Sequence, residues 1–353
     1  MAIDTLRVWN LRNHGQSELT PAVTTTLVTG ANGSGKTTLV EAAALFATLS
    51  SPRSSSLGQL VSEGAEEGGA HLECTDGVPL EVRIRGGRSV MRAAGSGVSA
   101  RNFLGRFRAV IFTPEDLDVV RGEPELRRRT VDQLITQRWP RYRDVRREYD
   151  RALRQRNAAI RHGRAADAAL YDAPLAEAGA QVLDARRETV DALRPSAVEL
   201  YKELAGRGEL EVAYRDTSEV GDLRGSELAE HLRVRYEADL GKHLERGRTT
   251  LGPHRDDLDL TVDGRPARSH ASRGEQRSAA LALRLAELRL LPDAVLLLDD
   301  VLSELDPDRR GRVFRVATGV QTVMTATDEA SVPADVEVGS YWTLNAGVLR
   351  AVG

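Results

Sequence analysis

The chain has 353 residues, of which 41% are apolar and 29% charged, a composition typical of an ordinary globular protein of about two domains. The formal net charge is only −3, so binding partners must be inferred from how the charges are distributed. A single cysteine, Cys74, excludes an intramolecular disulfide and a cysteine-based metal cluster, and the lack of a long apolar run or signal-peptide core leads us to expect a cytoplasmic protein with no membrane partner.

The first third of the chain has the pattern of strands around one glycine-rich loop. Residues 3–9 predict an edge strand. The β-branched run at 24–29 predicts a second strand, which leads through the loop into a helix at 39–47. Further on, the pattern predicts a mobile surface loop at 50–69, a hairpin of strands 71–75 and 80–85 with its turn at 76–79, and a short buried strand at 109–112.

The loop at 30–38 reads Gly-Ala-Asn-Gly-Ser-Gly-Lys-Thr-Thr and fits G-x-x-x-x-G-K-[ST], the pattern that wraps the phosphates of a nucleoside triphosphate. Its glycines let backbone N–H groups approach phosphate oxygens, and the following helix adds the positive end of its dipole. Lys36 supplies a point charge for the β and γ phosphates, and the Thr37 hydroxyl supplies a ligand for Mg²⁺. A chance glycine-rich turn is the alternative, but the flanking strand and helix disfavour it. The predicted nucleotide site comprises Gly30, Ala31, Asn32, Gly33, Ser34, Gly35, Lys36, Thr37 and Thr38.

The pattern changes to charged helices from about residue 125. One helical stretch runs to residue 164, and Pro140 is expected to kink or divide it. A second stretch runs from 175 to 204, with an expected kink at Pro195. We expect the two stretches to pack as an antiparallel arm. Between residues 121 and 164 there are fourteen arginines and only six acidic residues.

This arginine-rich stretch is the best local candidate for a DNA surface, because arginine binds backbone phosphates strongly and without sequence preference. Aromatic residues make up only 4% of the chain, which disfavours stacking on single-stranded bases and favours a duplex. Two alternatives stay open: a solvated helix face with intrahelical ion pairs, such as Asp144 with Arg147, and a DNA surface on the sheet side of the nucleotide-binding domain. The candidate DNA-binding residues are Arg127, Arg128, Arg129, Arg143, Arg146 and Arg147.

The last third of the chain returns to alternating strands and helices. His254 stands close to Asp256 and Asp257, but no second histidine or cysteine is adjacent in the sequence, so we favour a structural role over a metal site. No chemistry is assigned to His14 or His270. The pattern predicts strands at 209–214, 258–262, 294–298 and 321–325, and helices at 278–290 and 307–317.

The predicted strand at 294–298 ends in two carboxylates, Asp299 and Asp300. Downstream of a phosphate loop, such a strand delivers the first carboxylate to Mg²⁺ and the second to the attacking water, which it orients or deprotonates. A buried strand capped by exposed acids is the alternative, and the phosphate loop makes that interpretation less favoured.

Residues 272–276, Ser-Arg-Gly-Glu-Gln, open the next helix and admit two interpretations. In a capping box, Ser272 is the N-cap and Glu275 closes back on it. In an anion site, the same helix N-terminus offers N–H groups and a dipole to a phosphate. The motif alone favours the cap. Together with the loop and the two carboxylates, it resembles the signature of ATP-binding-cassette ATPases, which in that family binds the γ-phosphate held by a second protomer.

The whole chain resembles the SMC-like branch of the ATP-binding-cassette ATPases, and within it most closely the RecF family of bacterial recombination mediators. The short helical arm fits that family and excludes the long coiled coils of SMC proteins. The stretches that carry the resemblance span nearly the whole chain: residues 6–13, 30–38, 113–117, 121–128, 153–157, 251–256, 272–277 and 298–306.

The resemblance implies an α/β fold, with an ABC-type ATPase head formed by residues 1–124 and 246–353 and a smaller helical arm inserted at 125–245. It implies a protein that binds ATP and Mg²⁺, forms a homodimer with ATP, and binds duplex or gapped DNA. With RecO and RecR, such proteins help to load RecA during DNA recombination, repair, replication and the SOS response, in the cytoplasm at the nucleoid.

By position, the resemblance assigns ATP to the loop together with Arg12 and Asn13, Mg²⁺ to Thr37 and Asp299, and catalysis to Asp300. It assigns the partner's ATP to the signature and the dimer contact to the segment after the carboxylates. The signature residues are Ser272, Arg273, Gly274, Glu275 and Gln276, and the contact residues are Ser303 and Asp306.

Departures from the general cassette pattern predict slow hydrolysis. Asp300 stands where most members have Glu, and Glu115 lies near the position of the usual glutamine-containing loop. The sequence Thr-Ala-Thr-Asp at 325–328 lacks the histidine that senses the γ-phosphate. The expected activity is therefore a weak DNA-dependent ATPase that serves as a release switch. A subunit of a membrane transporter, or an SMC-like structural ATPase, is the alternative.

Overall fold

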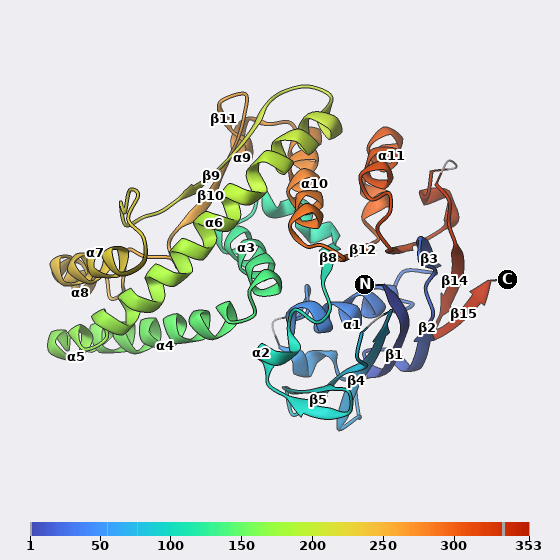
Figure 1. Cartoon of the computed structure of the whole chain (residues 1–353), viewed down its shortest axis with the longest axis horizontal. Coiled ribbons are helices and arrows are strands. Elements are labelled where there is room, and N and C mark those ends of the chain that lie inside the picture. Colours follow the sequence, from blue (N-terminus) through green and yellow to red (C-terminus); the bar gives the residue numbers. More distant parts are fainter. Residues whose placement is uncertain (1, 55, 76, 334–335, 353) are drawn as a thin grey trace.

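The computed structural model describes residues 2–54, 56–75, 77–333 and 336–352. Position 76, in the predicted hairpin turn, and position 55, in the predicted surface loop, lie outside them. Figure 1 shows an α/β head that contains both ends of the chain and a helical arm that projects from it.

The centre of the head is a sheet with strand order β15-β14-β3-β13-β12-β8. Its neighbouring strands are parallel, apart from the antiparallel pair of β14 and β15. The strands predicted at 24–29, 109–112, 294–298 and 321–325 are confirmed, whereas β14 and β15 have no predicted counterpart. The bounds are β3 Thr25–Thr29, β8 Ala109–Phe112, β12 Val295–Asp299, β13 Thr322–Ala326, β14 Ser340–Asn345 and β15 Val348–Val352.

A second, antiparallel sheet has strand order β2-β1-β4-β5-β6-β7. The predicted hairpin is confirmed as β4 and β5. The prediction of an edge strand at 3–9 is wrong, because β1 is hydrogen-bonded to β2 on one side and to β4 on the other. The bounds are β1 Ile3–Leu11, β2 His14–Leu19, β4 Glu67–Cys74, β5 Leu80–Arg85, β6 Arg88–Ala93 and β7 Ser96–Val98.

Helix α1 (Lys36–Thr48) packs against strands of both sheets, which explains why almost all of its side chains are buried. The segment after it does not run freely over the surface as predicted. Ser51 and Leu60 are each only 1% exposed, and Leu60 ends a short 3-10 turn that begins at Leu57. Packing against α1 and β1 therefore fixes a segment whose Ser, Gly and Glu content suggested mobility.

The arm begins with two helices, α3 (Pro124–Arg138) and α4 (Tyr142–Arg161), and the break between them falls at the predicted Pro140. The second predicted stretch is one continuous helix, α6 (Asp172–Ala205), which contains Pro195 and packs against α4. Shorter helices complete the arm: α5 Ala165–Ala169, α7 Gly225–Ala238 and α8 Leu240–Glu245.

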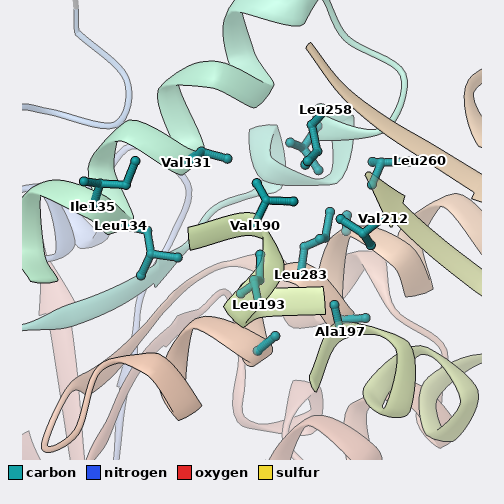
Figure 2. Close-up of a cluster of buried hydrophobic side chains, with 14 of the residues drawn as sticks. Val131, Leu134, Ile135, Val190, Leu193, Ala197, Val212, Leu258, Leu260 and Leu283 are labelled. Atoms are coloured by element: carbon teal, nitrogen blue, oxygen red, sulfur yellow. The ribbon is translucent and has the colours of Figure 1, made fainter. Parts of the chain in front are cut away.

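A small third sheet joins arm and head. Strand β9 (Leu210–Arg215), from the segment assigned to the arm, pairs with β10 (Asp257–Val262), from the segment assigned to the head, and β10 pairs with β11 (Arg265–Pro266). Figure 2 shows the apolar cluster beneath this junction, in which residues of α3, α6, β9 and β10 meet Leu283 of α10. Arm and head therefore share a core, and the division at residues 125 and 245 stays a proposal.

The remaining helices are α2 Ala100–Phe103, α9 Ala267–His270, α10 Arg273–Leu290 and α11 Pro307–Val316. The two longer ones confirm the helices predicted at 278–290 and 307–317. Within the described ranges, no helix is both long and apolar enough to cross a membrane.

Candidate nucleotide site

The phosphate loop connects β3 to α1 at the carboxyl edge of the parallel sheet, where α/β proteins bind their ligands. Two of its glycines are required by their surroundings. A Cβ on Gly35, whose φ is +111°, would lie 2.5 Å from Nε2 of His14, and a Cβ on Gly30 would lie 2.3 Å from the carbonyl oxygen of Leu344. The loop is thus held closely between the β1–β2 turn and β14.

Lys36 folds back over the loop. Its Nζ donates hydrogen bonds to the carbonyl oxygens of Gly30 at 2.7 Å and Ala31 at 3.1 Å, and the residue is 6% exposed. The ammonium group is therefore already positioned at the mouth of the loop, beside the N-terminus of α1. An incoming phosphate competes with two neutral acceptors for this charge and offers the stronger, charge-assisted bond.

Two hydroxyl groups converge on the carboxylate of Asp299. Thr37 Oγ1 donates to Asp299 Oδ1 at 3.0 Å, and Thr325 Oγ1 donates to the same oxygen at 2.8 Å. Burial raises the pKa of Asp299, and the two hydrogen bonds oppose that rise. Strand β13 lies between β3 and β12 in the sheet, so Thr325 reaches the carboxylate from the neighbouring strand. This set of hard oxygen donors, a hydroxyl beside a carboxylate, fits Mg²⁺.

Asp300 is fixed by its backbone. Its φ is +51°, a left-handed conformation that aspartate tolerates better than most residues. Its N–H donates to the carbonyl oxygen of Thr325 at 3.1 Å and to Thr325 Oγ1 at 3.0 Å, and Ser303 Oγ donates to its carbonyl oxygen at 2.8 Å. The second carboxylate therefore follows the first on a rigid, sharply turned segment.

Three consecutive residues that follow β1 in the second sheet, Arg12, Asn13 and His14, contact the loop or the helix after it. Asn13 Nδ2 donates to the carbonyl oxygen of Gly33 at 3.1 Å, and His14 Nε2 donates to that of Gly35 at 3.0 Å. Arg12 forms a two-pronged ion pair with Glu41 of α1, at 2.7 and 2.9 Å. Of the two predicted residues, Asn13 thus contacts the loop, whereas the Arg12 guanidinium is bound by Glu41 and Ser54.

His14 is a functional-site residue that the sequence interpretation missed. It is fully buried, burial lowers its pKa, and its Nδ1 lies 2.7 Å from Ser17 Oγ. The only sequence signal was its position directly after Asn13. Its contact with Gly35 supports the loop that binds phosphate rather than the phosphate itself.

The signature forms a capping box at the start of α10. Ser272 Oγ accepts from the N–H of Glu275, and a Glu275 carboxylate oxygen accepts from the N–H of Ser272 at 2.7 Å. Ser272 and Arg273 are exposed, and Gly274 lies against the guanidinium of Arg309. The capping interpretation is therefore correct, and the anion interpretation stays a prediction.

Gln276 requires a correction to the predicted signature site. Its side chain is buried, and Nε2 donates to the carbonyl oxygens of Ala267 at 3.0 Å and Arg268 at 3.2 Å. The amide therefore ties α10 to α9 within the chain and does not face a partner. Ser303 and Asp306, the predicted dimer contacts, are exposed, and Asp306 also caps α11.

The predicted DNA-binding arginines divide into buried and accessible residues. Arg127 is a correction: it is 5% exposed and forms a two-pronged ion pair with Asp257, at 2.7 and 2.9 Å. It also donates to the carbonyl oxygens of Val119 and Gly122, so its guanidinium is occupied within the fold. The five that stay accessible, at least in part, are Arg128, Arg129, Arg143, Arg146 and Arg147.

His254 has a structural partner on each ring nitrogen. The hydroxyl of Tyr149 donates to Nδ1 at 2.6 Å, and Nε2 donates to the carbonyl oxygen of Thr249 at 3.1 Å. Burial lowers the pKa of His254 to about 4, so the ring is neutral at physiological pH. Both nitrogens are therefore committed within the chain.

Known proteins resemble this chain over nearly its whole length. A family model described as the RecF/RecN/SMC N terminal domain matches residues 2–332. The DNA replication and repair protein RecF of Myxococcus xanthus is 36% identical over 362 residues, 97% of this chain and 95% of its own length. The protein of the same name from Kineococcus radiotolerans is 39% identical over 371 residues, 95% of this chain and 94% of its own.

Solved structures extend the likeness to the fold. The recombination mediator protein RecF-ATP, in the RecFOR pathway, is 27% identical and superposes with a TM-score of 0.89, covering 100% of this chain and 98% of its own. An SMC head bound to the C-winged helix domain of ScpA is 15% identical, with a TM-score of 0.57 over 100% of this chain and 97% of its own, and shows the shared head fold alone.

Proposed function

The chain belongs to the RecF family of DNA replication and repair proteins, and from that premise we propose that it is an ATP-gated, DNA-binding recombination mediator. The RecF-ATP structure supports ATP as the nucleotide for residues 30–38. Membership in this family also removes the support for a transporter subunit. An SMC-like structural ATPase without useful hydrolysis stays a weaker alternative, which a measured turnover would exclude.

Within one protomer, the phosphate loop binds the triphosphate and Lys36 turns from the loop carbonyls to the β and γ phosphates. Thr37 and Asp299 hold Mg²⁺, which neutralises phosphate charge when it is bound. Asp300 orients and deprotonates the attacking water. Its side chain is one methylene shorter than the glutamate usual in cassette ATPases, and this supports slow turnover and a switch-like use of ATP.

The proposal depends mainly on one observation: the chain contains one phosphate loop and one signature, and the signature, residues 272–276, forms no hydrogen bond or ion pair with the loop, residues 30–38, among the described residues. A γ-phosphate bound by the loop of one protomer then needs the signature of a second. ATP serves as the link between two protomers, with Ser272, Gly274 and the N-terminus of α10 completing the partner's site.

This arrangement predicts that the rate of ATP hydrolysis per molecule rises with protein concentration until the dimer is saturated. The test is steady-state hydrolysis measured across the concentration range in which sedimentation shows dimer formation. A rate per molecule that stays constant while the dimer fraction changes would count against the shared site.

DNA binding follows from the dimer by linkage: ATP favours the dimer and the dimer favours DNA, so DNA in turn strengthens ATP binding. The accessible arginines of α3 and α4 support contacts to a duplex backbone. We propose duplex DNA at gaps as the substrate, with RecO and RecR as partners in loading RecA, in the cytoplasm at the nucleoid. Binding to gapped and plain duplex, titrated against salt with and without ATP, tests this step, and affinities that ATP leaves unchanged would contradict it.

A further inference from the structure

A cavity of about 480 Å³ opens between the end of α1 and the arm helices α3 and α4. A volume of this size suits a small anionic ligand or a segment of a larger one. We call it the arginine recess, and define it by Arg128 and Arg129 of α3, Arg143 and Arg146 of α4, and Thr48 and Ser50 on the head side.

Three of these cations, Arg128, Arg129 and Arg143, form no ion pair with any acid that the structure describes. The hydrogen bonds of Arg128 and Arg129 go instead to backbone carbonyl oxygens, of Asp256 at 2.7 Å and of Ser51 at 2.8 Å. Neutral acceptors orient a guanidinium without neutralising it, so the recess keeps a concentrated positive charge.

The acids beside the recess compensate only part of this charge: burial outweighs Asp257, Glu125 and Asp132, which act to raise the pKa of Arg128, and Asp144, which acts to raise that of Arg143. Asp132 lines the recess but is occupied by Arg186, at 2.8 and 2.9 Å, and by Arg146, at 3.5 Å. Glu125, the other acid in the lining, is exposed. In addition, Nη1 of Arg146 is buried without a hydrogen-bond acceptor among the described residues. A buried donor of this kind marks a missing acceptor.

The electrostatics also favour an anion. Burial lowers the pKa of Arg128 and of Arg143, and a neighbouring cation, Arg186 or Arg147 respectively, adds to the effect. A lowered pKa means that the charged form of each guanidinium is less stable here than in water. A bound anion would relieve both the lost hydration and the repulsion, whereas an apolar or cationic ligand would relieve neither.

We propose that the arginine recess is a second phosphate-binding site, separate from the nucleotide loop, in which Arg128, Arg129 and Arg143 grip one phosphate group. Guanidinium forks suit phosphate oxygens in geometry as well as in charge. The phosphate belongs either to a nucleic-acid strand or to a free phosphate compound. The site does not depend on the proposed DNA function, because the same contacts serve both sources.

The test is calorimetric titration of the full-length protein with pyrophosphate. Arg143→Gln is the main variant, since this side chain has no ion pair or hydrogen bond to lose among the described residues, and Arg128→Gln is the second. The matched control is Arg151→Gln, which removes the same charge from an exposed position on the same helix and lies outside the recess. All these proteins keep the nucleotide loop, so pyrophosphate binding there is common to them.

We expect the wild type and Arg151→Gln to bind pyrophosphate at two sites, and each recess variant to lose about ten-fold in affinity at one of them. Equal titrations for Arg143→Gln and Arg151→Gln would overturn the proposal. A short blunt duplex then identifies the source: its affinity falls in Arg143→Gln if strand phosphates occupy the recess, and stays equal to that of Arg151→Gln if free phosphate does. The pyrophosphate titration contains no DNA, so its failure leaves the proposed DNA binding untouched.

Discussion

Arg127 and Arg129 are a natural pair for testing which arginines hold the fold and which meet a ligand. They lie two residues apart on α3 and carry the same charge, yet Arg127 is buried and Arg129 is exposed. Replacing each with Met removes one positive charge and keeps the aliphatic stem. Any difference between the two variants therefore reports the local partners and not the net charge.

The expected cost of Arg127→Met follows from what it leaves behind. Asp257 loses two hydrogen bonds, of 2.7 and 2.9 Å, and the carbonyl groups of Val119, in a buried bond, and Gly122, in a part-buried one, lose the Arg127 donor. Removing one partner of a buried ion pair costs about 3–5 kcal/mol. Asp257 keeps Arg215 at 3.5 Å and the N–H of Leu258 at 2.8 Å, which favours the lower end, about 3 kcal/mol. Arg129→Met loses a part-buried bond to the carbonyl oxygen of Ser51 and an exposed one to that of Pro52, both to neutral acceptors, and we expect a change of about 1 kcal/mol or less.

The assay is urea unfolding followed by circular dichroism, with phosphate and duplex titrations at a temperature where both variants are folded. We expect Arg127→Met to unfold at clearly lower urea and, once folded, to bind the duplex as the wild type does. Arg129→Met should unfold at about the same urea concentration as the wild type and should bind the duplex more weakly. Equal urea midpoints for the two variants would refute the reasoning that assigns Arg127 to the fold.

Four further predictions address the nucleotide site and helix α10. Lys36→Met should abolish ATP-driven dimerisation in sedimentation, because the β and γ phosphates lose their cation, and a normal dimer would remove the loop assignment. Asp300→Asn should bind ATP and prolong the dimer, whereas retained hydrolysis would place the catalytic carboxylate elsewhere. Gln276→Leu should cost about 1–3 kcal/mol of stability, because the carbonyl oxygens of Ala267 and Arg268 lose the side-chain donor they share and Ala267 keeps only the N–H of Ala271, and an unchanged melting temperature would contradict its structural role. Glu287 is a buried carboxylate of α10, outside the nucleotide site, and pairs with Arg284 at 2.9 Å. Burial raises the pKa of Glu287 to about 7 from its ordinary 4.5, so folding stability at this site falls as pH rises between those values. Glu287→Gln should therefore gain melting temperature relative to the wild type between pH 5 and pH 8, and parallel pH profiles would contradict this.

The sequence predicted those parts of the site whose chemistry depends on short, contiguous patterns. The loop needs its glycines within a few residues of Lys36, and a continuous apolar run identifies β12 and the two carboxylates after it. These features are local, so they can be read without knowing the rest of the fold. Strands β3, β8 and β13 of the central sheet were predicted for the same reason, whereas β14 and β15 were not.

Most of what the sequence did not predict depends on partners far away in the chain. Arg127 differs from Arg129 only because Asp257, 130 residues later, lies beside it. His14, in the second sheet, contacts Gly35, in the loop after a strand of the central sheet. The strand predicted at the edge, 3–9, is internal because it pairs with β4. Long-range contacts of this kind leave no periodic signal in one sequence. Gln276 is different, because its two carbonyl partners in α9 lie only eight and nine residues before it, and it was missed because the signature pattern gives the residue types and not the direction of the side chain.

The central claim is that each chain holds half of an ATP site, and a mixing experiment tests it most directly. Lys36→Met disables the loop, and Gly274→Asp disables the signature by placing a carboxylate against the partner's γ-phosphate. The second change should leave the fold intact, because an acid in the first turn of α10 is favourable and Arg309 lies beside it. We expect each variant alone to be inactive and their equimolar mixture to recover about a quarter of the wild-type ATPase rate, from one intact site in each mixed dimer. A mixture as inactive as its two components would contradict the shared site.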